Sequence, residues 1–185
     1  MGRRKTIDRD EILRVAEEIV SSSGVNKLTI DAVARAAGVS VGGVQYTFRS
    51  KESLIEAMLQ RWTESYARVM EEVVGPTPTP IDAIKAHIEV TASSDPGLQT
   101  RAASMLASLL NSPDHLGATR GWYRERLLGL DVDSARGRRA RVAFMAAEGA
   151  FFLRYFGFLA ISESEWADLF EDCISMMDDA DRASS

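Results

Sequence analysis

The chain has few of the residues that build disulfides, metal centres or catalytic sites. Its 185 residues include one cysteine, Cys173, and two histidines. A single cysteine excludes a framework of internal disulfides and is typical of a reducing cytoplasm, where we expect this protein to act. So few soft ligands argue against a metal cluster. A nucleophile motif and a glycine-rich phosphate loop are both lacking, so we expect no enzymatic activity and no cofactor.

Segments that would direct the chain into a membrane are also lacking. The first 15 residues contain basic side chains but no apolar run after them, so we expect no signal peptide. Residues 142–162 are apolar enough to suggest a transmembrane helix. However, Glu148 and Arg154 lie inside this run, and a charge near the bilayer centre costs about 2.5–3.5 kcal/mol. We therefore expect a globular protein, for which 45% hydrophobic and 26% charged residues are ordinary values.

The most specific pattern in the chain is LTIDAVARAAGVSVGGVQYTFRSKESL, residues 28–54. It predicts two short helices joined by a tight turn, followed by the start of a longer helix. Ala34 falls where the two helices approach most closely, and Gly38 follows the first helix at a position that favours a left-handed backbone. This spacing indicates a helix-turn-helix that reads DNA. The expected apolar contacts are Val33, Ala37, Val39, Val44 and Phe48.

The second of these helices has an apolar side and a polar side. At 100° per residue, Val41, Val44 and Phe48 share the inward side. The outward side suits a helix laid into the major groove, because an amide can bind adenine with two hydrogen bonds and hydroxyls can reach phosphate. Glycines would let the helix approach a duplex closely. The alternative is a solvated surface helix. The outward residues are Gly42, Gln45, Tyr46 and Arg49.

Residues 8–59 resemble the DNA-binding region of the tetracycline-repressor (TetR) family of bacterial regulators. The resemblance rests on DEILRVAEEIVSSSG, LTIDAVARAAGVS, a short recognition helix ending at Phe48, and SKESLIEAML. The family usually has a tyrosine where this chain has Gln45, and an aromatic residue or histidine at the next two positions. Tyr46 fits that pattern and Thr47 departs from it, so the base preference does not follow from the resemblance.

A cationic arm, Gly2-Arg3-Arg4-Lys5, precedes the first helix. Residues 1–50 hold eight Lys or Arg and six Asp or Glu, a balance of +2, although the whole chain has a net charge of −5. Such an arm can follow the DNA backbone or enter a minor groove; the alternative is a tail that only aids solubility. The resemblance also implies phosphate contacts at the positions of Thr29 and Lys51. The full set of expected DNA contacts is Arg3, Arg4, Lys5, Thr29, Ser40, Val41, Gly42, Gly43, Gln45, Tyr46, Thr47 and Lys51.

The rest of the chain is expected to be helical throughout. A fourth helix should span residues 51–74, and GPTPTP at 75–80 should break it. Short connections then favour an antiparallel bundle. We predict an all-α fold of about nine helices, with a three-helix DNA-binding domain (1–50) and a helical domain for ligand binding and dimerisation (51–185). The later helices are expected near 80–94, 97–111, 115–130, 133–161 and 163–179.

The last two helices are the expected dimer interface. The segment 143–160 is apolar almost all round, so a single chain of this size is not expected to cover it fully. The resemblance implies the same arrangement, in which two-fold symmetry fits paired half-sites about 34–36 Å apart. The alternative is that both helices only complete the core of one chain. The expected interface residues are Ala143, Ala147, Ala150, Arg154, Gly157, Trp166, Phe170, Cys173, Ile174 and Met177.

A ligand pocket is expected inside the bundle. Aromatic and methionine side chains suit flat or flexible apolar ligands. Glu148 lies within the apolar run AAEGAFF, where a carboxylate needs a partner or a ligand. His87 and Tyr123 also belong to this group, although we expect His87 to be a satisfied or partly exposed histidine, and each residue alone can be plain core. The expected ligand-binding residues are Trp62, Tyr66, Met105, Leu109, Trp122, Phe144, Glu148 and Phe151.

Together these patterns predict a homodimeric transcriptional regulator that binds a palindromic operator and is released by a small apolar or aromatic effector. By family analogy it is a repressor. Two alternatives stay open. One is a regulator with a fully packed core, controlled by a protein partner or by none. The other is a helical dimer, structural or ligand-sequestering, whose DNA reader has decayed.

Overall fold

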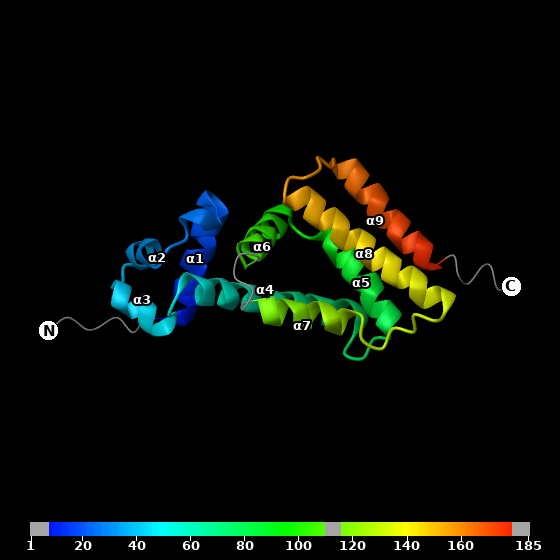
Figure 1. Ribbon diagram of the computed structural model, residues 1–185, viewed down its shortest axis with the longest axis horizontal. Helices are drawn as coiled ribbons and strands as arrows, with labels where there is room; N and C mark the ends of the chain where they lie inside the picture. The colour runs from blue at the N-terminus through cyan, green and yellow to red at the C-terminus, as the bar shows by residue number, and fades with distance from the viewer. Residues whose placement is uncertain (1–7, 110–115, 179–185) are drawn as a thin grey trace. The chain divides into compact units, whose positions relative to one another are not determined.

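The computed structural model describes residues 8–109 and 116–178. Within these ranges the chain forms nine α-helices, one short 3-10 helix and no strand (Figure 1), which confirms the predicted all-α fold. None of the described helices combines the length and hydropathy needed to cross a membrane. The helices are α1 (Arg9–Ser23), η1 (Val25–Lys27), α2 (Ile30–Ala37), α3 (Val41–Thr47), α4 (Lys51–Val74), α5 (Pro80–Ser93), α6 (Pro96–Leu109), α7 (Gly117–Arg126), α8 (Ala135–Tyr155) and α9 (Glu163–Asp178).

The chain divides into two compact units. The first comprises Met1–Glu64 and Gly97–Leu116, and the second comprises Ser65–Pro96 and Gly117–Ser185. Helix α4 therefore contributes residues to both units. The predicted boundary between a DNA-binding domain (1–50) and a ligand-binding domain (51–185) is a functional division, which these compact units do not test. It stays a prediction.

Helix α1 supplies one wall of the first unit. Asp8 caps it by accepting a hydrogen bond from the backbone N–H of Asp10 at 2.9 Å. The predicted apolar stripe faces the core, since Ile12 and Ala16 are buried. Gly24 ends the helix with a φ of +80°, a conformation that other residues rarely adopt.

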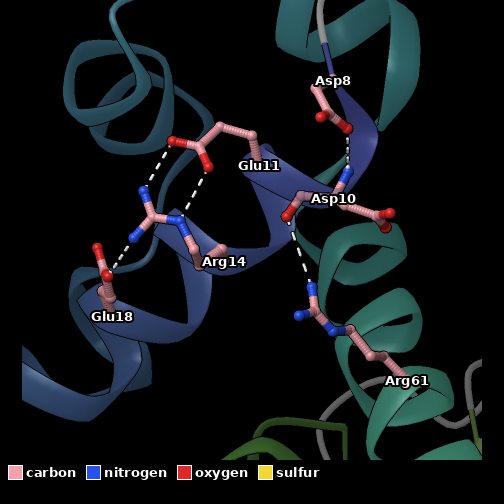
Figure 2. Close-up of polar contacts among 6 residues, drawn as sticks. All are labelled: Asp8, Asp10, Glu11, Arg14, Glu18 and Arg61. Atoms are coloured by element: carbon pink, nitrogen blue, oxygen red, sulfur yellow. Dashed lines mark hydrogen bonds and ion pairs between the residues drawn. The ribbon is translucent and has the colours of Figure 1, made fainter.

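The outer face of α1 carries a charged cluster, drawn in Figure 2. The guanidinium of Arg14 lies between the carboxylates of Glu11 and Glu18, and both of these raise the pKa of Arg14, Glu11 most strongly. These exposed pairs contribute little to stability. Arg61 of α4 reaches the carbonyl oxygen of Asp10 at 3.5 Å and the carboxylate of Glu17 at 3.8 Å, so it links α4 to α1.

Helices α5, α8 and α9 pack against one another in the second unit. Alanines on the inner side of α8 let its neighbours approach, and Ala143 and Ala147 are fully buried. From α9, Trp166 is buried and its indole N–H donates to the carbonyl oxygen of Ala92 on α5 at 3.1 Å. The core of this unit therefore lies between the three helices.

Two helices end earlier than expected. Helix α8 was expected to reach residue 161, but it ends at Tyr155 because Gly157 turns the backbone to a φ of +75°. The N–H of Phe158 then bonds to the carbonyl of Leu153, which closes the helix end. Helix α7 was expected to reach residue 130 but ends at Arg126, where a series of short turns leads to Gly129.

Candidate DNA-binding and effector sites

The helix-turn-helix forms as its spacing predicted. The N–H of Ala32 donates to the hydroxyl of Thr29 at 3.0 Å, which caps α2. Gly38 ends α2 with a φ of +66°, in the left-handed region. Ala34 is buried at the helix contact with 2% exposure, so a larger side chain there would separate the helices.

Helix α3 presents its polar side away from its own unit. Ser40 caps the helix by accepting from the N–H of Gly43 at 3.1 Å. Val44 and Phe48 are buried, whereas Gln45 is exposed and Tyr46 is 91% exposed. A phenol left in solvent by its own fold is available to a partner, and the major groove is the partner that a helix-turn-helix suits.

Other expected DNA contacts have partners inside the first unit. The ammonium of Lys51 donates to the carbonyl oxygen of Val25 at 2.9 Å. The hydroxyl of Thr47 lies 3.4 Å from the carbonyl oxygen of Gly43. An ammonium has three donors, so Lys51 can still reach a phosphate.

Val41 and Gly42 are exposed, and the cationic arm (Arg3, Arg4 and Lys5) lies outside the described residues.

The second unit contains a line of hydrogen bonds between side chains from four helices. The phenol of Tyr66 (α4) lies 2.6 Å from Nδ1 of His87 (α5). Nε2 of His87 lies 2.8 Å from Oε1 of Glu148 (α8), and the phenol of Tyr123 (α7) donates to Oε2 of Glu148 at 2.6 Å. His87 is 2% exposed and the side chain of Glu148 12%. We name this line the Tyr66–Tyr123 network.

The donors of the network point toward Glu148. A carboxylate can only accept hydrogen bonds, so Nε2 of His87 donates to Glu148, and Nδ1 of His87 is left to accept from the phenol of Tyr66. We accordingly assign the Nε2–H tautomer to His87, and this N–H donates to Glu148. Burial raises the pKa of Tyr123, and the carboxylate of Glu148 raises it further. Burial also raises the pKa of Tyr66, so both phenols keep their protons.

Aromatic rings surround the network. The ring centroids of Trp122 and Tyr123 lie 4.9 Å apart, that of Trp122 lies 5.9 Å from Tyr66, and that of His87 lies 5.0 Å from Phe144. The guanidinium carbon of Arg126 lies 4.4 Å from the centroid of the Trp122 ring and 5.8 Å from that of Tyr66. The arrangement combines a carboxylate, a histidine and a guanidinium within apolar walls, as in a site for a small organic molecule.

Four of the eight predicted pocket residues, Tyr66, Trp122, Phe144 and Glu148, meet in this cluster. Trp62 and Met105 belong to the first unit, and Met105 is buried in its core. Phe151 makes its ring contacts further along α8 with Phe152 and Tyr155. The side chain of Leu109 lies outside the described part of the chain.

Sequence reasoning gave too little weight to His87 and missed Arg126. His87 is a satisfied histidine, as expected, but it is also the central member of the network. Arg126 ends α7, where a basic residue usually interacts with the helix dipole. Its spacing of four residues from Trp122 was the available signal, because such residues lie on the same helix face.

Most of the expected interface residues lie inside the second unit. Ala143, Ala147, Ala150, Trp166, Phe170, Cys173 and Met177 are buried by the chain itself. They complete its core, the alternative that the sequence left open. Arg154 and Ile174 are half-buried and Gly157 is exposed. Contact of any of them with a partner stays a prediction.

The opposite side of α8 is apolar and uncovered in the single chain. Val142 is 52% exposed, Met145 53% and Leu153 42%. Positions between them carry the small residues Ala146 and Gly149, which would let another helix approach closely. We name this surface the outer α8 stripe. It consists of Val142, Met145, Ala146, Gly149, Phe152, Leu153 and Phe156.

Two family models match the sequence. The model described as bacterial regulatory proteins of the tetR family matches residues 12–58. The model described as the tetracyclin repressor-like C-terminal domain matches residues 82–178. The first match includes the helix-turn-helix, and the second includes His87, Tyr123 and Glu148. A search of curated proteins finds no match.

Several solved structures share the fold. A transcriptional regulator from Rhodococcus sp. Rha1 is 18% identical, with a TM-score of 0.67 over 92% of this chain and 96% of that one. The multidrug binding protein EbrR, complexed with ethidium, is 19% identical, with a TM-score of 0.64 over 90% and 97%. The fatty acid degradation regulator FadR from Bacillus halodurans is 15% identical, with a TM-score of 0.60 over 93% and 97%. Identities this low support a shared fold and nothing finer.

Proposed function

The chain belongs to the TetR family of bacterial transcriptional regulators, and we propose that it is a repressor that binds a palindromic operator as a homodimer and leaves it when a small effector binds. The observation that carries this proposal is the outward polar side of α3, with Gln45 and Tyr46 exposed. Family members are DNA-binding proteins and not enzymes.

We propose that the two subunits meet through the outer α8 stripe, together with the exposed side of α9. The stripe is apolar along its length, and monomeric proteins seldom leave a continuous apolar surface exposed. A two-fold axis would place the same stripe of the second copy against it. Such a dimer presents two copies of α3 to two operator half-sites.

The effector is proposed to bind at the Tyr66–Tyr123 network. EbrR has been solved with ethidium and with imidazole, so this fold is compatible with small organic ligands of different kinds. Helix α4 carries Tyr66, and only three residues separate its start from the end of α3. We propose that the effector favours a different position of α4, and thereby of α3. A ligand that bound both states equally would shift nothing.

The test is a gel-shift titration of the full chain against DNA fragments that flank its own gene, with a scrambled fragment of equal length as the control. We expect selective binding, with an affinity that falls as salt rises, because Lys and Arg side chains displace counterions from the phosphates. Footprinting should then find two symmetric half-sites. Equal affinity for both fragments at every salt concentration would contradict the proposal and favour a decayed reader.

A further inference from the structure

We infer that the effector carries a carboxylate, or another planar oxyanion, on an apolar body, and that Arg126 is the residue that binds this anion. The inference rests on the proposed function and names the chemical class of ligand for the same site. It depends on two charged side chains of the cluster. Both oxygens of Glu148 already accept hydrogen bonds, whereas Nε of Arg126 has no acceptor.

Arg126 has an unmade hydrogen bond. Its Nε is buried, and no acceptor among the described residues reaches it. Two aromatic rings, those of Trp122 and Tyr66, hold the guanidinium in place. Buried polar groups in folded proteins are nearly always hydrogen-bonded, so an exception on a charged side chain calls for an explanation. A ligand that supplies the missing acceptor would explain why Nε of Arg126 is left without a partner in the chain itself.

The charge of Arg126 already acts on the interior of the cluster. It opposes the rise in the pKa of Tyr66 that burial causes, so the guanidinium lies close enough to influence the network electrostatically. A guanidinium presents Nε and a neighbouring nitrogen as a planar fork that fits the two oxygens of a carboxylate. An anion beside Trp122 would therefore both complete the hydrogen bonding of Arg126 and neutralise its charge.

The carboxylate of Glu148 is the rival anchor, and it favours a cationic effector. However, both of its oxygens already accept hydrogen bonds, from His87 at 2.8 Å and from Tyr123 at 2.6 Å. A cation at Glu148 would have to replace at least one of these bonds. An anion at Arg126 replaces none, and this difference decides between the two classes of effector.

The apolar part of the effector has suitable surroundings. Trp122 and Tyr123 both come from α7, and their rings contact Tyr66, His87 and Phe144 from other helices. These contacts have centroid separations of 5.8–6.5 Å, within the range of ordinary aromatic pairs, so the apolar body of a ligand would pack against aromatic faces and edges here. A flat aromatic acid or a fatty acid of moderate length fits this description.

The test compares ligands that share a body and differ in the head group. Isothermal titration calorimetry of the full chain would use 2-naphthoate, 2-naphthamide and 2-naphthylmethylammonium, then octanoate, octanamide and octylammonium. We expect one or both carboxylates to bind about tenfold or more tightly than the matching amide and ammonium, as a charge-assisted bidentate pair allows.

Variants on α7 assign the effect to a residue. R126Q should weaken carboxylate binding about tenfold and leave amide binding within about twofold. R126K keeps the charge without the fork and should lose less. The matched control is R124Q, which removes an exposed arginine from the same helix turn and should change nothing. A thermal melt of each variant verifies folding before the titrations.

Three results would overturn the inference: equal or tighter binding of an amide or ammonium, unchanged carboxylate binding by folded R126Q, or no binding of either carboxylate by the parent chain. None of these contradicts the proposed function, which fails only in the gel shift. A parent chain that binds its operator and is released by octylammonium would keep that function and refute the anionic effector. A chain that binds naphthoate through Arg126 but binds no DNA would support the anionic ligand and refute the proposed function.

Discussion

Nε2 of His87 on α5 lies 2.8 Å from Oε1 of Glu148 on α8, so two residues 61 positions apart form a polar contact in the interior of the second unit. Buried polar groups cost stability when unpaired and little when every hydrogen bond is made. The Tyr66–Tyr123 network satisfies His87 and Glu148 through two tyrosines from two further helices. Its arrangement allows a quantitative test.

Replacing Tyr123 by Phe should lower the free energy of unfolding by about 1.5–3 kcal/mol, the usual value for a hydrogen bond to a charged group. The phenol of Tyr123 is one of two donors to Glu148, and Phe keeps the ring contacts. Urea denaturation measures the change. In a double-mutant cycle with Glu148→Leu, which has no acceptor, the two losses should not add, because the residues share one bond. Full additivity would show that the bond contributes nothing.

Two glycines of the reader should respond in opposite directions to alanine. Gly38→Ala should destabilise the chain by about 1–2 kcal/mol, since Gly38 has a φ of +66° and a Cβ is strained there even though no atom lies within 4 Å of it. Gly42→Ala should stabilise the chain by up to about 1 kcal/mol, because Gly42 is helical and its Cβ would also meet open space. Thermal melts provide the measurement.

The same Gly42→Ala variant separates folding from DNA binding. If the start of α3 approaches the duplex closely, the added methyl group should weaken operator binding while the melting temperature rises. A variant with unchanged affinity would place the duplex farther from Gly42 than we propose.

Gln45→Ala and Tyr46→Ala should each weaken operator binding, by about 5-fold to 150-fold if the side chain makes one good base contact of about 1–3 kcal/mol. Both side chains are exposed, so neither change should alter the melting temperature. The control is Glu18→Ala on the outer face of α1, which should leave gel shifts unchanged. Parent-like shifts for both α3 variants would mean that another face reads the DNA.

The contribution of Glu17 to the free energy of unfolding should change with pH. Burial raises the pKa of Glu17 above its ordinary value of 4.5, against the opposing effect of Arg61 and then Arg101. The folded state therefore binds this proton more tightly than the unfolded state, and stability falls as the pH rises from about 4.5 through the folded pKa. Glu17→Gln should melt higher than the parent at pH 7 and like it at pH 4. A parent that gains stability relative to the variant as the pH rises would reverse the assignment.

The outer α8 stripe should control the oligomeric state. A double variant, Val142→Glu with Met145→Glu, would bury four carboxylates in a two-fold interface and should yield monomers. Size-exclusion chromatography with light scattering measures the mass. Leu128→Glu is the matched control, since Leu128 is 72% exposed in the same unit but outside the stripe. A double variant that stays dimeric would move the interface elsewhere.

Local signals were sufficient for the helix-turn-helix and for α4. The left-handed turn requires a residue such as Gly38 and the close helix contact requires a small one such as Ala34, and α4 runs from Lys51 to Val74 as its apolar spacing and the following GPTPTP predicted. The orientation of α3 followed from Val44 and Phe48, because only one side of that helix is apolar. In these segments the residue type alone was enough to predict whether a side chain is buried and where a helix ends.

Helix α8 shows where such inference stops. From Ala143 onward it is apolar almost all round, so periodicity cannot tell the side that packs against α5 and α9 from the side left open. The small residues were assigned to the interface, yet Ala143 and Ala147 fill the core of a single chain. Arg126 posed a different difficulty, because a basic residue at a helix end resembles an ordinary solvated side chain until Trp122 is seen beneath it.

The common direction of the donors in the Tyr66–Tyr123 network has a mechanical consequence. The bonds from Tyr66 to His87 and from His87 to Glu148 run head to tail, so each polarises the other and is strengthened by about 10–30% over an isolated bond. Tyr123 donates to the same carboxylate from the other side and therefore competes with His87. If Tyr123 on α7 withdrew its proton from Glu148, the carboxylate would pull harder on His87, and His87 on the phenol of α4. A relay of this kind would transmit a change on one helix to the helix that begins beside the reader.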